Sequence, residues 1–147
     1  MRTIATITFM LCLPAFFHSN VMAFDLTPPS KYYWYSDGVK VPIWQSTAKQ
    51  KSHISPVYQT SPNPDSTKMI LTGGVIVHFS IDWAEQQITN LMSRYETRKG
   101  TRLPLGENIY LFQSETVSGS LALANAIYQS GQVTAAYPDW MVLEPAR

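Results

Sequence analysis

From Val75 onward the chain alternates between strand-like and helix-like segments, and the order of these segments constrains the fold more than any other feature. Val75, Val77 and Phe79 would share one face of a strand at 75–79, and the next segment carries an apolar stripe at helical spacing. In order, the expected segments are a strand at 75–79, a helix from Asp82 to Lys99, strands at 101–105 and 108–113, a small-residue helix at 121–129 and a strand at 133–137.

The ends of the two expected helices carry recognisable signals. Asp82 and Glu85 have capping-box spacing, and Lys99-Gly100 supplies a stop for the first helix. Gly131 supplies a stop for the second helix. The order strand, helix, strand, strand, helix, strand predicts an α+β domain over 73–140, namely a ferredoxin-like (βαββαβ) antiparallel sheet with two helices on one face.

The first 23 residues have the pattern of a secretory signal peptide. Arg2 precedes an apolar run at 4–17, and Val21-Met22-Ala23 supplies a small-residue cleavage site. A membrane anchor is the alternative, but the run is shorter than the roughly 20 residues that a spanning helix needs. We therefore expect a periplasmic or secreted protein with no membrane association after cleavage, and no thiol in the mature chain, because Cys12 is the single cysteine.

Residues 24–72 are expected to form an N-terminal extension made of an aromatic hairpin and a linker. Asp37-Gly38 lies between two β-prone stretches and predicts a hairpin, whose second strand Pro42 places at an edge. A Ser-, Thr- and Pro-rich connection follows from Gln45 to Thr72, with a short strand considered at 53–58. Either the aromatic residues clamp the hairpin onto the core, or they form a carbohydrate-binding or envelope-binding platform: Tyr32, Tyr33, Trp34, Tyr35 and Trp44.

The strand expected at 108–113 is apolar on both faces. Ile109 and Leu111 alternate with Tyr110 and Phe112. A sheet that helices cover on one side only should be polar on its other side. The pattern therefore predicts that the open face of the sheet contacts a second protein.

Composition and motifs exclude several classes of function. Eleven basic and ten acidic residues leave a charge near zero, which argues against nucleic acid as a partner. His53 and His78 have no neighbouring metal-ligand residues, and we expect no metal site and no cofactor. The mature chain contains no nucleophile motif or phosphate-binding glycine loop, so we expect a binding protein with no catalytic residues rather than an enzyme.

Residues 120–140 resemble the final helix and strand of the propeptides of bacterial subtilisin-like serine proteases. The resemblance lies in a Leu/Ala-rich helix, the run Tyr128-Gln129-Ser130-Gly131, a strand led by Val133, and Pro138-Asp139 followed by an aromatic residue. The hairpin at 32–43 is similar to one found ahead of some of these propeptides. The chain also resembles a free-standing propeptide, the external chaperone of a kexin-like protease that lacks its own, because no protease domain follows Arg147.

This resemblance implies a chaperone and inhibitor that forms a 1:1 complex with a subtilisin-like, possibly kexin-like, serine protease. The open sheet face would contact the protease surface through Tyr110, Phe112, Tyr137 and Asp139. The C-terminal tail at 141–147 would enter the substrate cleft as a product-like inhibitor through Leu143, Glu144, Pro145, Ala146 and Arg147.

Three positions bear on this implied mode of binding. Arg147 would occupy the primary specificity pocket of the protease, and Asp139 would cap helix N-termini on its surface. Tyr137 stands where the family has a glutamate, so a two-carboxylate cap is not complete in this chain. Ala146 precedes Arg147, so the tail lacks the dibasic pair that a kexin-like enzyme prefers.

Overall fold

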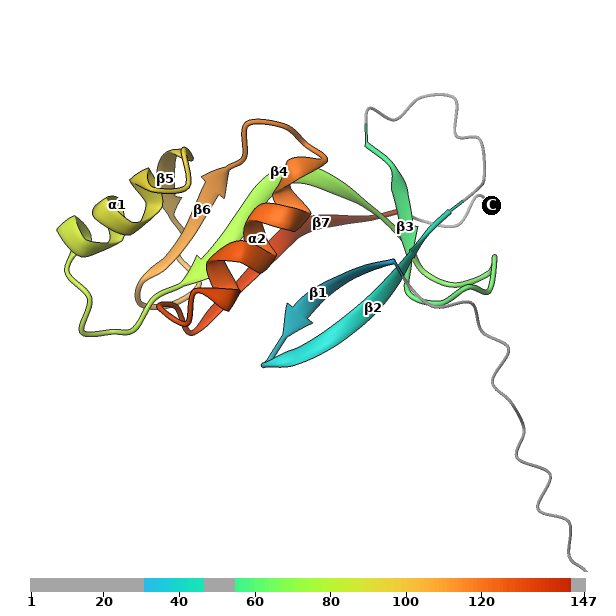
Figure 1. The fold of residues 1–147 in the computed structure, drawn as a ribbon, viewed down its shortest axis with the longest axis horizontal. Coiled ribbons are helices and arrows are strands. Elements are labelled where there is room, and N and C mark those ends of the chain that lie inside the picture. The colour runs from blue at the N-terminus through green and yellow to red at the C-terminus, as the bar shows by residue number, and fades with distance from the viewer. Residues whose placement is uncertain (1–30, 47–54, 144–147) are drawn as a thin grey trace, which may run out of the picture.

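The computed structural model describes residues 31–46 and 55–143, which form an α+β structure with one antiparallel sheet (Figure 1). The elements are, in chain order, β1 Tyr32–Ser36, β2 Val39–Gln45, β3 Val57–Gln59, β4 Lys68–His78, α1 Glu85–Ser93, β5 Arg98–Arg102, β6 Ile109–Gln113, α2 Gly119–Gln129 and β7 Ala135–Leu143. The sheet has seven strands, and Figure 1 shows α2 in front of β4 and α1 at the end of the molecule beside β5.

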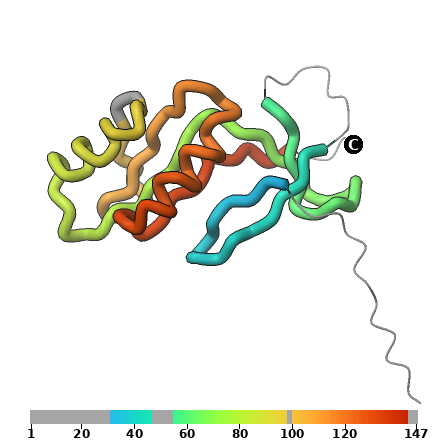
Figure 2. Tube along the Cα trace, in the orientation of Figure 1, coloured from blue at the N-terminus to red at the C-terminus, as the bar shows by residue number. Residues whose placement is uncertain are grey.

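The long strand β4 joins the N-terminal extension to the rest of the sheet. Its first half pairs with β3 and β7, and its second half pairs with β6 and β7. Figure 2 shows this strand, in green, passing through the middle of the trace. The connection expected up to Thr72 therefore ends earlier, at Lys68, and the expected start of the main domain at residue 73 falls inside β4.

The main core lies between the two helices and one face of the sheet. Val75 and Val77 of β4 are fully buried there, together with Ala124 and Ile127 of α2. Ile88 belongs to the same core, so α1 packs on the same face as α2. The small side chain of Ala124 lets α2 lie close to β4 and β7, as its Ala-rich composition predicts.

A second core lies under the hairpin. Leu121, at the start of α2, reaches it, so this one helix packs against both cores. The residues of the second core are Ile43, Tyr58, Met69, Leu71 and Leu121. The hairpin extension is thus packed on the same helix that stabilises the main sheet.

The predicted hairpin at 32–43 is confirmed. Ser36 pairs with Val39, and the turn residues Asp37 and Gly38 have φ values of 48° and 80°. Two positive φ values are what a type I′ turn requires, and they explain the Asp-Gly sequence. Pro42 lies where β2 pairs with β1 alone, because β3 pairs only with Trp44 and Gln45.

The expected end of the last strand at Tyr137 is wrong. β7 continues through Pro138 to Leu143, and Met141 pairs with Ile70 of β4. Pro138 is tolerated because β7 has only β4 as a strand partner and the register shifts beside this proline. Gly73, with a φ of +93°, lies in the irregular part of β4 that produces the shift.

The first helix is shorter than the sequence indicates. It begins at Glu85 rather than at Asp82, because Gln87 Oε1 accepts a hydrogen bond from the Ala84 N–H at 2.8 Å and closes the first turn. It ends at Ser93, after which Glu96 has a φ of 52°. The expected stop, Gly100, instead lies inside β5, so the strand expected at 101–105 begins at Arg98.

The second helix and the strand before it agree with their predictions. α2 spans Gly119 to Gln129 and is followed by Gly131 with a φ of +69°. Its first turn is held by Thr116, whose hydroxyl oxygen accepts a hydrogen bond from the Gly119 N–H at 3.1 Å. β6 begins at Ile109, one residue after the expected start.

Candidate functional site

The sheet face opposite the helices carries the strongest candidate for a functional surface. Because side chains alternate along a strand, Ile76 and His78 of β4 point away from the core that holds Val75 and Val77. The strand register places Leu111 beside Ile76 and Ile109 beside His78. Members of this open face are Ile76, His78, Ile109, Leu111, Ala135, Tyr137, Asp139 and Met141.

Much of this open face is apolar and remains accessible. Ile76, Ile109 and Leu111 are half-buried neighbours on adjacent strands. Met141, farther along β7, keeps 48% of its surface exposed. A contiguous apolar surface on a sheet face is typical of a site that binds another protein.

Two of the expected contact residues lie on the other side of the sheet. Phe112 pairs with Val75 and is only 4% exposed, and Tyr110 pairs with Val77 and packs against the same core. Both side chains therefore face α1, and their strand presents Ile109 and Leu111 on the open face. The period-2 pattern showed two apolar faces, but it could not show which one the helices cover.

Tyr137 lies on the open face at its border with the hairpin. Its hydroxyl is 2.9 Å from His78 Nε2, and its ring meets the Trp34 ring edge to face at 6.1 Å. Burial, and secondly the negative charge of Asp37, raise the pKa of Tyr137 above its ordinary value of 10.0. The tyrosine thus connects β4, β7 and the hairpin turn.

Asp139 lies next to Tyr137 along the chain, beside the irregular part of β4. Its Oδ2 accepts a hydrogen bond from the Thr72 hydroxyl at 2.7 Å, which fixes the direction of the carboxylate. A side chain at Gly74 would come within 3.0 Å of Asp139 Cβ, so the glycine makes room for the aspartate. A carboxylate has about four lone-pair sites, so one hydrogen bond leaves capacity for further donors.

Part of the expected tail at 141–147 belongs to the sheet, and the rest lies outside the described residues. Leu143 pairs with Lys68 at the end of β7 and so belongs to the sheet. The remaining tail residues, Glu144, Pro145, Ala146 and Arg147, lie outside the described residues. Any segment that leaves the sheet therefore begins after Leu143 rather than at residue 141.

The hairpin aromatics pack within the chain. Tyr35 stacks on Tyr128 of α2 with ring centroids 4.4 Å apart, and Trp34 meets the Trp140 ring at 6.3 Å. The ammonium group of Lys40 lies 3.7 Å from the centre of the Tyr33 ring. These contacts favour the interpretation in which the aromatic residues clamp the hairpin against β7 and α2.

Several members of the open face were not singled out from the sequence. Ile76 lies in a run of apolar residues, and His78 is considered from the sequence only as a possible metal ligand. Met141 falls after Pro138, where no strand was expected. Placing Val75, Val77 and Phe79 on the core face implies that Ile76 and His78 lie on the other face, whereas Met141 depends on the pairing of β7 with β4.

Within 31–46 and 55–143, His, Cys, Asp and Glu side chains form no group of three or more that could hold a metal ion. None of the helices in these ranges has the length and apolar character needed to cross a bilayer. No family model, curated protein or solved structure matches this chain.

Proposed function

We propose that this protein binds a subtilisin-like serine protease through the open face of its sheet and acts as an external chaperone and inhibitor of that protease. The observation that carries the proposal is the half-exposed apolar surface of Ile76, Ile109 and Leu111, on the side of the sheet opposite the helices. Association would bury this surface, and burial of apolar area is the main driving force of most protein–protein association.

The fold proposed for the protease-binding unit is ferredoxin-like. Three observations support it: the element order from β4 to β7, the strand order β7-β4-β6-β5 across this part of the sheet, and the packing of α1 and α2 on one face. The hairpin extension packs on the edge of this unit and leaves the face with Leu111 accessible.

The proposed mode of inhibition uses the chain after Leu143. Because β7 ends at Leu143, the next residues would leave the sheet from the strand that carries Tyr137, Asp139 and Met141 on the open face. An extended segment can add to the strands that line a protease cleft. Arg147 would then occupy the specificity pocket of the protease, where its guanidinium would pair with acidic groups.

Asp139 has a defined place in this proposal. A carboxylate at the N-terminus of a partner helix contributes roughly 0.3–1 kcal/mol. Thr72 holds the Asp139 carboxylate on the open face, so it would meet a partner helix without reorienting. Tyr137 beside it would contribute ring surface rather than a second charge.

The proposal includes export and a non-enzymatic role. The segment at 1–23 would direct the chain to the periplasm or the medium, where a secreted protease matures. No catalytic residues, cofactor or metal are assigned, and the chain would act by binding alone.

A kinetic titration tests this function. The chain without residues 1–23 is added to a panel of bacterial subtilisin-like proteases, including kexin-like enzymes, while hydrolysis of a peptide substrate is followed. We expect tight 1:1 inhibition of at least one enzyme. Absence of inhibition across the panel would contradict the proposal.

A truncation distinguishes the role of the tail from the role of the open face. Deletion of residues 144–147 should greatly weaken inhibition while the chain still binds the inactive Ser→Ala form of the same protease. The deletion should begin at Glu144, because removal of Leu143 would also disrupt its pairing with Lys68. Unchanged inhibition by the truncated chain would show that the tail does not occupy the cleft.

A further inference from the structure

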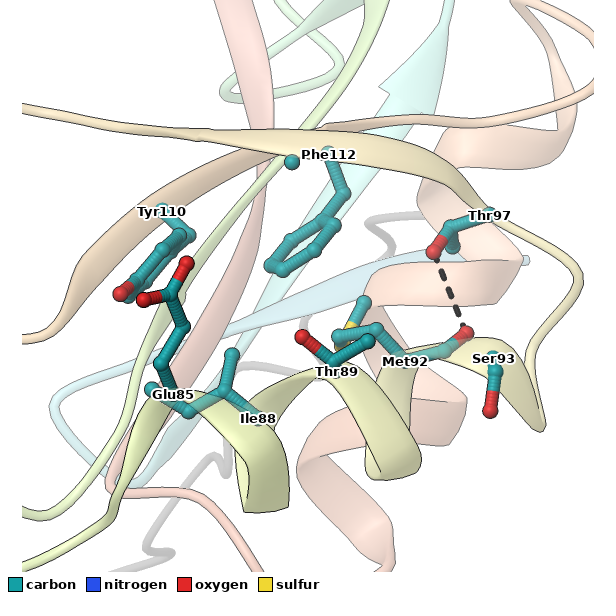
Figure 3. Close-up of a pocket in the computed structure, with 9 residues that line it drawn as sticks. Glu85, Ile88, Thr89, Met92, Ser93, Thr97, Tyr110 and Phe112 are labelled. Atoms are coloured by element: carbon teal, nitrogen blue, oxygen red, sulfur yellow. Dashed lines mark hydrogen bonds between the residues drawn. The ribbon is translucent and has the colours of Figure 1, made fainter.

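A pocket of about 220 Å³ lies between α1 and the β5–β6 strand pair, on the helix side of the sheet (Figure 3). Ile88 and Met92 of α1 form one wall, and Tyr110 and Phe112 of β6 form the other. The rings of Tyr110 and Phe112 are stacked with centroids 5.9 Å apart. The pocket therefore has an apolar and aromatic interior.

On the β5 side, the pocket is lined by the backbone of a glycine. Gly100 lines it, and a Cβ atom built there would lie 2.3 Å from Phe112 Cε1. The phenyl ring thus occupies the space above the glycine backbone. Ile88 and Met92, each 2% exposed, complete the wall from α1 without filling the space between helix and strands.

Among the side chains that the structure describes, the rim of the pocket is polar and carries one charged group. Two rim hydroxyls are already used by α1: Ser93 donates to the Asn90 carbonyl at 2.9 Å, and Thr97 donates to the Met92 carbonyl at 3.2 Å. That charged group is Glu85, in the first turn of α1; the Tyr110 phenol is the other ionisable group among the described lining side chains. Figure 3 shows the Glu85 carboxylate beside Tyr110, at the opposite end from Thr97.

We infer that this pocket binds a small organic cation that consists of one aromatic ring and a short side chain ending in an ammonium group. The carboxylate of Glu85 complements the cation, and the partly exposed ring of Tyr110 offers aromatic surface to the apolar part. Drug-sized ligands occupy pockets of about 300–1,000 Å³. The smaller volume here fits a single ring with a short side chain.

The pocket is independent of the proposed protease-binding face. Tyr110 and Phe112 project toward α1, whereas their strand neighbours Ile109 and Leu111 project to the other side of the sheet. A ligand in the pocket and a protein on the open face can therefore be bound together. If an experiment shows no ligand binding in the pocket, the proposal of protease binding on the open face still stands, and the reverse also holds.

The test uses 2-phenylethylamine, with the neutral alcohol 2-phenylethanol as its matched control. Methyl signals of Ile88 and Met92 are followed by NMR in the chain without residues 1–23. For a ligand of this size we expect saturable shifts with a Kd on the order of 1 mM for the amine. The alcohol should bind about fivefold more weakly, because it lacks the charge.

A variant pair locates the charge. Glu85→Gln should weaken amine binding about fivefold and leave alcohol binding unchanged, whereas Glu115→Gln, at an exposed carboxylate outside the pocket, should change neither. Equal binding of amine and alcohol would overturn the inference, and so would an unchanged Kd in Glu85→Gln. Absence of saturable shifts at Ile88 and Met92 would overturn it as well.

Discussion

The Thr72 hydroxyl donates a hydrogen bond to Asp139 Oδ2 at 2.7 Å and ties the irregular part of β4 to the strand beside it. The same hydroxyl oxygen accepts from the Gly74 N–H at 3.2 Å. One side chain thus stabilises the bulge and orients the carboxylate that we assign to the binding face.

Replacing Thr72 by valine keeps the shape of the side chain and removes all three hydrogen bonds of the hydroxyl, namely those to Asp139 Oδ2, to the Asp139 carbonyl and from the Gly74 N–H. We expect the free energy of unfolding to fall by about 1 kcal/mol, since the bond to a charged acceptor is lost at an exposed position. Urea denaturation measures the change. Thr101→Val, on an exposed position of β5, is the control and should be nearly neutral. Equal stability of the two variants would contradict the assigned role of Thr72.

Gly100→Ala should destabilise the contact between β5 and Phe112. The added Cβ would overlap the ring, and overpacking of this kind costs about 1–3 kcal/mol. The double variant with Phe112→Leu should lose less stability than the two single changes together, because the smaller side chain relieves the overlap. Thermal unfolding of the wild type, the two single variants and the double variant gives the coupling free energy between the two positions. Strictly additive changes in stability would show that the Phe112 ring does not restrict the side chain at position 100.

Tyr35→Ala should loosen the hairpin without unfolding the main sheet. It removes the stacked contact with Tyr128, and aromatic pairs contribute about 0.5–1.5 kcal/mol beyond their buried area. Hydrogen exchange should become faster in β1 and β2 and stay unchanged in the second half of β4. Val39→Ala, at an exposed hairpin position, serves as the control. Unchanged exchange in β1 would exclude a clamping role for Tyr35.

The stability of the protein should fall at alkaline pH in part because of Tyr137. Its pKa is raised by burial and by the charge of Asp37, so the folded chain retains the phenol proton where the unfolded chain releases it. The free energy of unfolding therefore falls as pH rises above about 10. Asp37→Asn keeps the turn, since asparagine tolerates a positive φ, and lowers the pKa of Tyr137.

The wild-type chain should accordingly lose more stability than Asp37→Asn between about pH 9 and pH 11. Urea denaturation across this range gives the difference, and tyrosinate absorbance reports the titration itself. Identical pH profiles would show that the Asp37 charge does not act on Tyr137.

The sequence predicted those turns and helix ends whose conformation depends on residues close together in the chain. Asp37-Gly38 specified the hairpin turn, and Gly131 specified the end of α2, because each needs a positive φ that few residues adopt. The α+β class followed from the order of the elements. These features depend on residues close together in the sequence.

Parts of the structure that depend on distant partners were not predictable in the same way. The first half of β4 follows a Ser- and Pro-rich stretch and is a strand because Met69 pairs with both Tyr58 and Val142. β7 continues past Pro138 because its proline lies at a register shift on an edge strand. The choice of face for Tyr110 and Leu111 also depends on where the helices pack.

The binding face is tested most directly by the Kd for a subtilisin-like protease in its inactive Ser→Ala form, measured for Leu111→Lys and Ala122→Lys. Both variants add the same charge, the first on the open face and the second on an exposed position of α2. We expect Leu111→Lys to weaken binding at least about 30-fold, because a charge would be buried at the centre of the interface, and Ala122→Lys to bind like the wild-type chain. Wild-type affinity in a folded Leu111→Lys variant would contradict the proposed binding face.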